Sequence, residues 1–304
     1  MKCNVCPRNC NVDRETTVGF CGCNQEIIIN LVMKHVWEEP IISGTKGSGV
    51  IFFGGCNLKC MYCQNQKISH LDKEEAQKIE FKCEKDIKIE EGKAFKTDIL
   101  GLCEVYRQVE NLGVHNINLV TPSHYTNEII QSLKVYKPSI PIVWNTSSYE
   151  KPCELEKLRG FVEIFLADYK YFDENLALEF SQARDYPSVC LEAIKKMREI
   201  SPKDELESGI LKRGLIIRHL VLPTCTKDSK NILESICKNF GTSTIISIMS
   251  QYLPYGEALN HKLLNRKISK LEYKIVLKTA ENLGFLNIFS QDYTSADEKF
   301  IPKF

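Results

Sequence analysis

The sequence lacks the features that mark membrane-bound, secreted and nucleic-acid-binding proteins. No apolar run approaches the roughly 20 residues that a membrane-spanning helix needs. The first ten residues, MKCNVCPRNC, contain no apolar core of a signal peptide. The 40 basic and 39 acidic residues leave a formal net charge of +1 without a basic run, which argues against nucleic acid and anionic membrane as partners. We therefore expect a cytoplasmic protein.

Cysteine, in contrast, is abundant, with 14 in 304 residues. In a secreted domain this number would indicate disulfides, but in a chain without a signal peptide it indicates metal sites and reduced thiols. Hydrophobic residues make up 43% of the chain, enough for a large core. We expect a cysteine-rich N-terminal extension (1–49) and a core (50–304), with a charged insertion near 69–97 that forms a hairpin or short helix over the mouth of the core.

Three of the cysteines lie on one short loop. Residues 50–53 (VIFF) form an apolar, β-prone run that predicts a buried strand, and two glycines end it. Cys56, Cys60 and Cys63 follow with the spacing C-x3-C-x2-C. Three thiolates on one loop suit a 4Fe–4S cluster in which one iron keeps an open coordination position, the mark of a catalytic metal site. The alternative is a zinc site whose fourth ligand comes from elsewhere in the chain.

A second group of cysteines opens the chain. Cys3, Cys6, Cys10 and Cys21 are spaced C-x2-C-x3-C-x10-C, and Cys23 follows two residues later. Four sulfurs at such spacing predict a second metal site, zinc or iron–sulfur, which would stabilise a segment with little core of its own. The spacing leaves open whether Cys21 or Cys23 is the fourth ligand. The alternative is a set of unligated thiols.

Beyond the cysteine loop, strand-like and helix-like segments alternate. Strands are expected at 50–53, 116–120, 140–144, 163–167, 215–221 and 244–250, with a short last strand at 286–289 and an extended segment at 26–32. Helices are expected at 97–113, 126–135, 152–158, 188–200, 229–240 and 269–283. Six βα repeats predict an α/β fold with a parallel sheet, a partial (β/α)6 TIM-like barrel.

Polar residues follow the expected strands one after another. In such a sheet the carboxyl ends of parallel strands meet at one edge, where ligands bind. Each group alone is also explained as a helix cap or a turn. The residues that we assign to a cofactor site at this edge are Thr121, Pro122, Ser123, Asn145, Ser147, Asp168, Lys170, Arg218 and His219.

The cysteine loop resembles that of the radical S-adenosylmethionine (SAM) superfamily, whose C-x3-C-x2-C usually has an aromatic residue before the last cysteine, as Tyr62 is here. The resemblance implies that the open iron binds SAM and that one electron from the reduced cluster cleaves it to a 5′-deoxyadenosyl radical, which abstracts hydrogen. It also implies that Tyr62 belongs to the cofactor site. Reduced flavodoxin or ferredoxin is the implied electron donor.

Over nearly the whole chain the sequence is similar to homologues of pyruvate formate-lyase activating enzyme. The segments that carry this likeness are CPRNC, HVWEEPIISG, GGCNLKCMYCQN, NINLVTPSHY, PIVWNTSSYE, RHLVLP, SQYLPY and GFLNIFSQD. The likeness implies that the partner is a glycyl-radical enzyme, from whose glycine Cα a hydrogen is removed. Asp168 and Lys170 match an Asp-x-Lys that contacts SAM in activases.

The sequence departs from these relatives in two places. Thr121, Pro122 and Ser123 stand where most radical SAM enzymes have Gly-Gly-Glu, and Tyr255 is followed by Gly256 where activases carry histidine. The glycyl-radical substrate therefore does not follow from the sequence. A radical enzyme acting on a small molecule or peptide is one alternative, and a non-enzymatic metal-binding protein is another. No residue is assigned a catalytic role.

Overall fold

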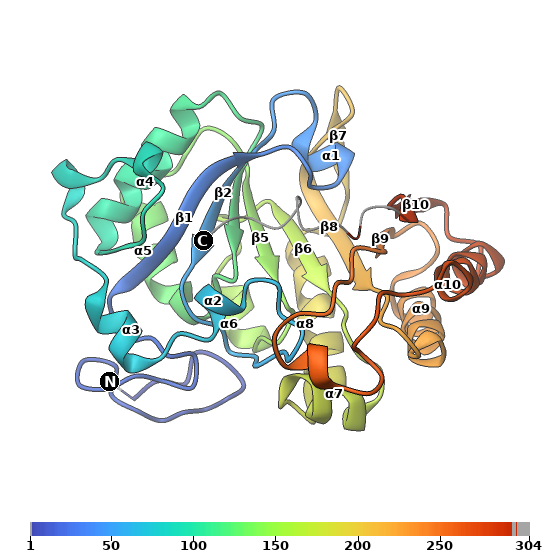
Figure 1. The fold of residues 1–304 in the computed structure, drawn as a ribbon. Helices are drawn as coiled ribbons and strands as arrows, with labels where there is room; N and C mark the ends of the chain where they lie inside the picture. The colour runs from blue at the N-terminus through green and yellow to red at the C-terminus, as the bar shows by residue number, and fades with distance from the viewer. Residues whose placement is uncertain (1, 294–295, 297–304) are drawn as a thin grey trace.

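The computed structural model describes residues 2–293 and 296 and has a mixed α/β architecture around one large sheet (Figure 1). The strands are β1 (Ile27–His35), β2 (Ser48–Phe53), β3 (Phe95–Thr97), β4 (Ile117–Val120), β5 (Ile142–Thr146), β6 (Ile164–Asp168), β7 (Glu205–Glu207), β8 (Ile210–Leu220), β9 (Ile245–Met249) and β10 (Asn287–Ser290). The helices are α1 (Pro40–Ser43), α2 (Gln66–Ser69), α3 (Lys73–Lys78), α4 (Ile99–Asn111), α5 (Thr126–Val135), α6 (Pro152–Glu156), α7 (Glu174–Ser181), α8 (Tyr186–Ile200), α9 (Thr226–Phe240) and α10 (Lys270–Asn282).

The sheet has the order β10-β9-β8-β6-β5-β4-β2-β1-β3, with β7 paired to β8. The pairs from β2 to β10 along this path are parallel, while β1 pairs antiparallel with β2 and with β3. The six strands expected from the sequence, and the short last one, are all present. Among the described residues the sheet stays open, with β3 and β10 at its edges, so closure into a barrel is not seen.

The central strands are buried on both faces, which explains their continuous apolar runs. All six residues of β2 are buried, as are all five of β5 and β9. Parallel strands of this kind need helices on their outer face to exclude water. Figure 1 shows α4 and α5 beside the β1–β2 side of the sheet and α9 and α10 beside β9 and β10. No helix among the described residues is both long and apolar enough to cross a bilayer.

The helix ends show which local signals the sequence encodes. Ser269 and Glu272 form a capping box at the start of α10, at the expected boundary of this helix. The helix expected from residue 97 begins at Ile99 instead, because Asp98 accepts the hydrogen bond from the Gly101 amide and Thr97 ends β3. Aspartate caps at least as well as threonine, so two adjacent candidates made the boundary ambiguous.

The charged insertion differs in placement from the expectation. It contains α3 and two short 3-10 turns and ends in β3, which pairs with β1 at the sheet edge. The insertion therefore extends the sheet rather than covering its mouth. Helix α7 was not expected, because its sequence, ENLALEFS, follows a strand end without a clear break.

Candidate functional site

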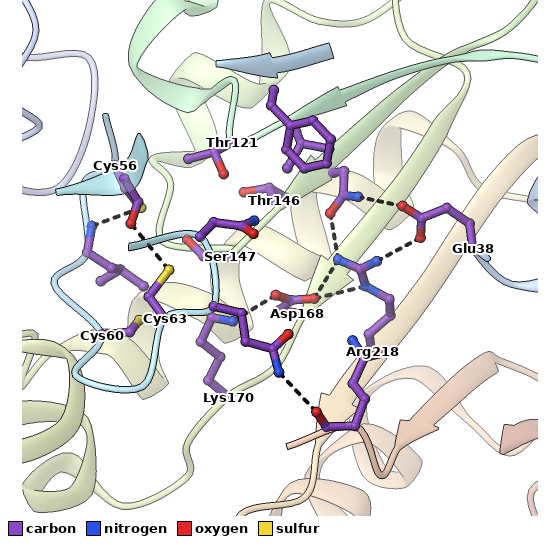
Figure 2. A pocket seen from close by; sticks show the side chains of 18 of the residues that line it. Glu38, Cys56, Cys60, Cys63, Thr121, Thr146, Ser147, Asp168, Lys170 and Arg218 are labelled. Carbon is purple, nitrogen blue, oxygen red and sulfur yellow. Dashed lines mark hydrogen bonds and ion pairs between the residues drawn. The ribbon is translucent and has the colours of Figure 1, made fainter. Parts of the chain in front are cut away.

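A cleft of about 450 Å³ opens at the carboxyl ends of the parallel strands (Figure 2). Cys56, Cys60 and Cys63 line one side of it, and charged side chains from β6 and β8 line the other. The cleft thus lies where the topology of a parallel sheet places ligand sites. It brings together the cysteine loop (residues 54–66) and polar residues that lie far away in the sequence.

The two glycines of the cysteine loop are required by close packing against the N-terminal segment. Gly55 has a φ of +80°, and a Cβ at this position would lie 2.4 Å from Cys23 Sγ and 2.5 Å from the Cys21 carbonyl oxygen. A Cβ at Gly54 would lie 2.5 Å from Ile28 Cγ2. Any side chain here would therefore displace backbone and buried sulfur, and it would push the loop away from the sheet.

Each sulfur of the triplet has a polar neighbour. The Leu58 amide donates to Cys56 Sγ at 3.4 Å. Ser181 Oγ lies 3.0 Å from Cys60 Sγ, and Ser69 Oγ lies 3.2 Å from Cys63 Sγ. Donors placed at sulfur stabilise thiolates bound to iron.

Burial raises the pKa of the Cys56 thiol to about 12 and that of Cys60 to about 11. Both thiols are therefore protonated in the metal-free protein at neutral pH, and metal binding would displace their protons. Among residues 2–293 and 296, no three Cys, His, Asp or Glu side chains converge on a point suited to one metal ion. A 4Fe–4S cluster bonds each cysteine to a different iron, so its ligands need not converge in this way. The donor set fits such a cluster.

The opposite side of the cleft is a charged wall, made by Glu38, Asp168, Lys170 and Arg218. Lys170 Nζ lies 2.8 Å from Asp168 Oδ2, and Arg218 Nε donates to Asp168 Oδ1 at 2.9 Å. Arg218 also reaches Glu38 Oε2 at 3.3 Å. The side chains are 11% to 17% exposed, so water screens these charges little. Two cations and two carboxylates give the wall both signs of charge in a small space.

The pKa directions in the charged wall follow from burial and pairing. Burial opposes ionisation of Asp168, but the Arg218 and Lys170 charges outweigh it and lower the pKa of the Asp168 carboxyl. Burial likewise opposes the charged form of Lys170, and Asp168 raises the pKa of its ammonium. Glu38 differs because burial raises its pKa to about 7, while Arg218 pulls it downward. Glu38 is thus the group of the wall that titrates near neutral pH.

The titration of Glu38 makes stability depend on pH. Its carboxyl is faced by Arg218, Glu39, Asp168 and the Asn118 amide. With its pKa raised from 4.5 to about 7, folded protein keeps a proton that the unfolded chain releases between these values. The free energy of unfolding of wild type should therefore fall relative to Glu38→Gln as pH rises through this window, by on the order of 3 kcal/mol. Thermal melts of both proteins from pH 4 to 8 measure it, and parallel curves would contradict it.

Six of the residues assigned to the cofactor site line the cleft. They enter it from the ends of β4, β5, β6 and β8, as the alternation of side chains along a strand allows. Asn145 Oδ1 accepts a hydrogen bond from Arg218 at 2.5 Å and so joins the charged wall. The six are Thr121, Asn145, Ser147, Asp168, Lys170 and Arg218.

Four other assigned residues, Tyr62, Pro122, Ser123 and His219, lie outside the lining of the cleft. His219 follows Arg218 on β8 and points to the opposite face, where its ring nitrogens lie 2.8 Å from the Tyr169 carbonyl oxygen and 2.8 Å from Ser229 Oγ. Successive side chains of a strand point to opposite faces of the sheet, so Arg218 and His219 cannot both face the cleft.

Tyr62 and Ser123 are held by buried partners. The Tyr62 hydroxyl lies 2.6 Å from that of Tyr171, and Ser123 Oγ lies 3.4 Å from Thr146 Oγ1. Both side chains therefore support the site from behind, and the structure gives neither a direct place in the cleft.

Thr121 has an unusual backbone. Its φ is +58°, in the left-handed region that β-branched residues avoid. Such a conformation costs about 1–3 kcal/mol and persists where surrounding structure enforces it. The Thr121 amide donates to the Asn145 carbonyl oxygen at 2.9 Å, which fixes this turn at the edge of the cleft.

Sequence reasoning missed several lining residues. Glu38 lies in the connection between β1 and α1, and its Oε1 accepts a hydrogen bond from the side-chain amide of Asn118 in β4 at 3.0 Å. Gln64 and Gln291 also line the cleft, and Gln64 donates to the Gln251 carbonyl oxygen at 3.0 Å. The available signal for Glu38 was its position beside a second acid, Glu39, in the segment HVWEEPIISG.

The N-terminal cysteines gather beside the cysteine loop. Burial raises the pKa of the Cys6 thiol to about 11, and nearby Cys21, Cys10 and Cys3 add to the rise. A Cβ at Gly19 would lie 3.5 Å from Cys21 Sγ and 3.6 Å from Cys10 Sγ, so Cys21 belongs to this group. Cys23 instead donates to the Gly54 carbonyl oxygen at 3.1 Å. Cys21 therefore lies with the other N-terminal cysteines, while Cys23 contacts the cysteine loop.

Arg8 links the N-terminal segment to the cysteine loop. Its guanidinium donates to the carbonyl oxygens of Asn57 at 2.7 Å, Gln182 at 2.5 Å and Ser181 at 3.4 Å. The same group lies 4.0 Å from the centre of the Phe20 ring, a cation–π contact. The N-terminal segment is thereby bound to both the loop and the end of α7.

No family model matches the chain. An uncharacterised protein of Methanocaldococcus jannaschii is 28% identical over 293 residues, which cover 92% of this chain and 74% of that protein. A second uncharacterised protein of the same organism is 23% identical over 181 residues, 51% of this chain and 53% of that protein.

Solved structures give partial likenesses. SuiB of Streptococcus suis bound to its precursor peptide SuiA has a TM-score of 0.49 at 14% identity, over 79% of this chain and 48% of that chain. A radical SAM methyltransferase from Sphaerobacter thermophilus has a TM-score of 0.48 at 10% identity, over 81% of this chain and 70% of that chain. A domain of a pyruvate-formate lyase-activating enzyme from Bacteroides vulgatus has a TM-score of 0.40 at 14% identity, over 56% of this chain and 91% of that chain.

Proposed function

We propose that this chain is a radical SAM enzyme whose cysteine loop binds a 4Fe–4S cluster and whose charged wall binds SAM. One observation carries the proposal: Cys56, Cys60 and Cys63 lie on one loop, each with a polar neighbour at sulfur, and face a wall that presents both signs of charge. In this proposal the parallel strands correspond to the superfamily's partial (β/α)6 barrel.

When bound, the cluster would supply the electron for reductive cleavage of the sulfonium–C5′ bond of SAM, with a reduced flavodoxin or ferredoxin as its donor. This cleavage would yield methionine and a 5′-deoxyadenosyl radical, which would take a hydrogen atom from the substrate. The chain's own residues bind and orient. Lys170 and Arg218, which line the cleft, would meet the carboxylate of SAM, and Asp168 and Glu38 would meet its ammonium. Such two-point binding fixes the reacting carbon relative to the cysteine loop.

Release of 5′-deoxyadenosine tests this function. Anaerobically reconstituted protein, given a chemical reductant and SAM, should produce 5′-deoxyadenosine and methionine in amounts that depend on the reductant. Protein that carries iron and sulfide yet releases no 5′-deoxyadenosine would contradict the proposal. The cysteines are all free thiols, which supports a cytoplasmic location, because that compartment keeps thiols reduced.

We further propose that the hydrogen donor is a glycine Cα of a partner glycyl-radical enzyme. Support comes from the sequence segments shared with activating enzymes. A candidate partner encoded beside this gene, incubated with the reduced protein and SAM, should develop the doublet electron paramagnetic resonance (EPR) signal of a glycyl radical. If 5′-deoxyadenosine forms without that signal, the substrate is a small molecule or a peptide.

The gathered thiols of Cys3, Cys6, Cys10 and Cys21 support a second metal, which would draw them closer together than they lie here. A Cys3→Ala, Cys6→Ala double variant should lose one metal site, because two of four ligands are removed. Metal and sulfide analysis measures this, with Cys153→Ala, an exposed cysteine elsewhere, as the control. Unchanged iron, sulfide and zinc would mean that these are free thiols.

A further inference from the structure

Three buried hydroxyl groups form a continuous chain that ends on one sulfur of the cysteine loop. The Tyr62 hydroxyl lies 2.6 Å from that of Tyr171, which lies 2.6 Å from Ser181 Oγ. Ser181 Oγ in turn lies 3.0 Å from Cys60 Sγ. Tyr171 and Ser181 are fully buried and Tyr62 is 5% exposed, so bulk water does not compete with these bonds. We call Tyr62, Tyr171 and Ser181 the hydroxyl chain.

A thiolate at Cys60 sets the direction of this chain. A sulfur bound to iron carries no proton and only accepts hydrogen bonds. Ser181 must then donate to Cys60, so its oxygen accepts from Tyr171, and Tyr171 accepts from Tyr62. Hydrogen bonds arranged in series polarise one another, so the two tyrosines strengthen the donation by Ser181.

The backbone around Ser181 is fixed from both sides. Ser181 is the last residue of α7, and the Met61 amide donates to the Phe180 carbonyl oxygen at 2.9 Å. The Lys59 amide reaches the Ser181 carbonyl oxygen at 3.4 Å, as does Arg8 of the N-terminal segment. Helix α7 and the cysteine loop are thus held together on each side of Cys60. This geometry keeps the hydroxyl of Ser181 on the sulfur.

We propose that Ser181 is a positioning residue that raises the reduction potential of the cluster by donating a hydrogen bond to Cys60 Sγ, with the two tyrosines orienting its proton. This rests on the proposed function, because it requires the cluster. Donation to a ligand sulfur withdraws electron density and stabilises the reduced state, one of the ways in which proteins set the potentials of iron–sulfur clusters. In this proposal the Tyr62 hydroxyl acts on the cluster through Tyr171 and Ser181 and does not bind SAM.

The test is a redox titration of the reconstituted cluster, followed by EPR. Ser181→Ala should lower the midpoint potential, because one donor at sulfur is lost. Tyr171→Phe should lower it less, since Ser181 keeps its hydroxyl but loses its orienting partner. At a fixed donor potential, Ser181→Ala should release 5′-deoxyadenosine more slowly while its Kd for SAM stays that of wild type. Should Ser181→Ala fail to hold the cluster, Tyr62→Phe, which alters only the far end of the chain, provides the measurement.

Ser132→Ala is the matched control. Ser132 of α5 is also fully buried, and its Oγ lies 3.2 Å from a tyrosine hydroxyl, that of Tyr106 in α4. The cluster of Ser132→Ala should have the same midpoint potential as that of wild-type protein. A wild-type potential in Ser181→Ala and Tyr62→Phe, with the cluster intact, overturns the role of the hydroxyl chain and leaves the proposed function standing. Wild-type protein that takes up no iron and sulfide overturns both.

Discussion

Replacement of Cys60 with alanine is expected to abolish SAM cleavage. Cys60 is the middle cysteine of the proposed cluster site; it lines the cleft, and its sulfur lies 3.0 Å from Ser181 Oγ at the end of α7. With two local thiolates left, the cluster loses one of its three protein bonds, and its irons are no longer held opposite the charged wall. Anaerobic reconstitution should give less iron and sulfide than wild type, by the content of one 4Fe–4S cluster, and 5′-deoxyadenosine should fall to the level seen without reductant.

Cys103→Ala is the control for this variant. Cys103 is another buried cysteine, but it packs in α4 and its thiol donates to the Ser132 carbonyl oxygen at 3.3 Å. Its loss removes a small apolar side chain from the core and should leave cluster content and SAM cleavage at wild-type levels. Undiminished 5′-deoxyadenosine release by Cys60→Ala would exclude the cysteine loop as the cluster site.

The second large effect is expected at Asp168 and Lys170. The two side chains pair with each other at 2.8 Å, and Asp168 also binds Arg218. Their side chains are only 17% and 16% exposed, and for such shielded pairs the cost of desolvation offsets much of the attraction, so stability is a weak reason for two charges at a cleft. Hydrogen bonds to a charged ligand are each worth about 1.5–3 kcal/mol. Asp168→Asn and Lys170→Met should therefore each weaken SAM binding by roughly 10- to 100-fold.

Asp204→Asn supplies a matched control. Asp204 pairs with Arg198 at 2.8 Å, with side chains 19% and 22% exposed, much like the pair in the cleft, but it lies away from the cleft. Its variant should bind SAM like wild type. SAM affinity is measured by isothermal titration with cluster absorbance shown to be intact. If Asp168→Asn and Lys170→Met bind SAM normally and lose only thermal stability, their pair is structural.

Local patterns in the sequence were sufficient for much of the fold. The apolar runs of β2, β5 and β9 are buried on both faces, so their composition alone identified them. The cysteine triplet was equally visible, because its ligands lie on one loop. The order of polar residues after successive strands placed Asp168 and Lys170 in the cleft, as topology requires.

What the sequence did not predict depends on contacts between distant segments. Glu38 reaches Arg218 across 180 residues, and Ser181 reaches Cys60 across 121. No local signal encodes such a contact. The same holds for Gly55, whose missing side chain makes room for Cys23 of the N-terminal segment. His219 is a different case, because side chains alternate between the two faces of β8. Once Arg218 is assigned to the cleft, its neighbour His219 must point to the other face.

The most direct test of the whole account is the EPR spectrum of the reduced cluster before and after addition of SAM. In the proposed site, three protein ligands would leave one iron free, and the charged wall would hold SAM opposite the cysteine loop. We expect a 4Fe–4S signal in wild-type protein that is lost in Cys60→Ala. Its g values should change when SAM is added and should change less in Asp168→Asn. A cluster signal that saturating SAM leaves unchanged in wild-type protein would contradict it.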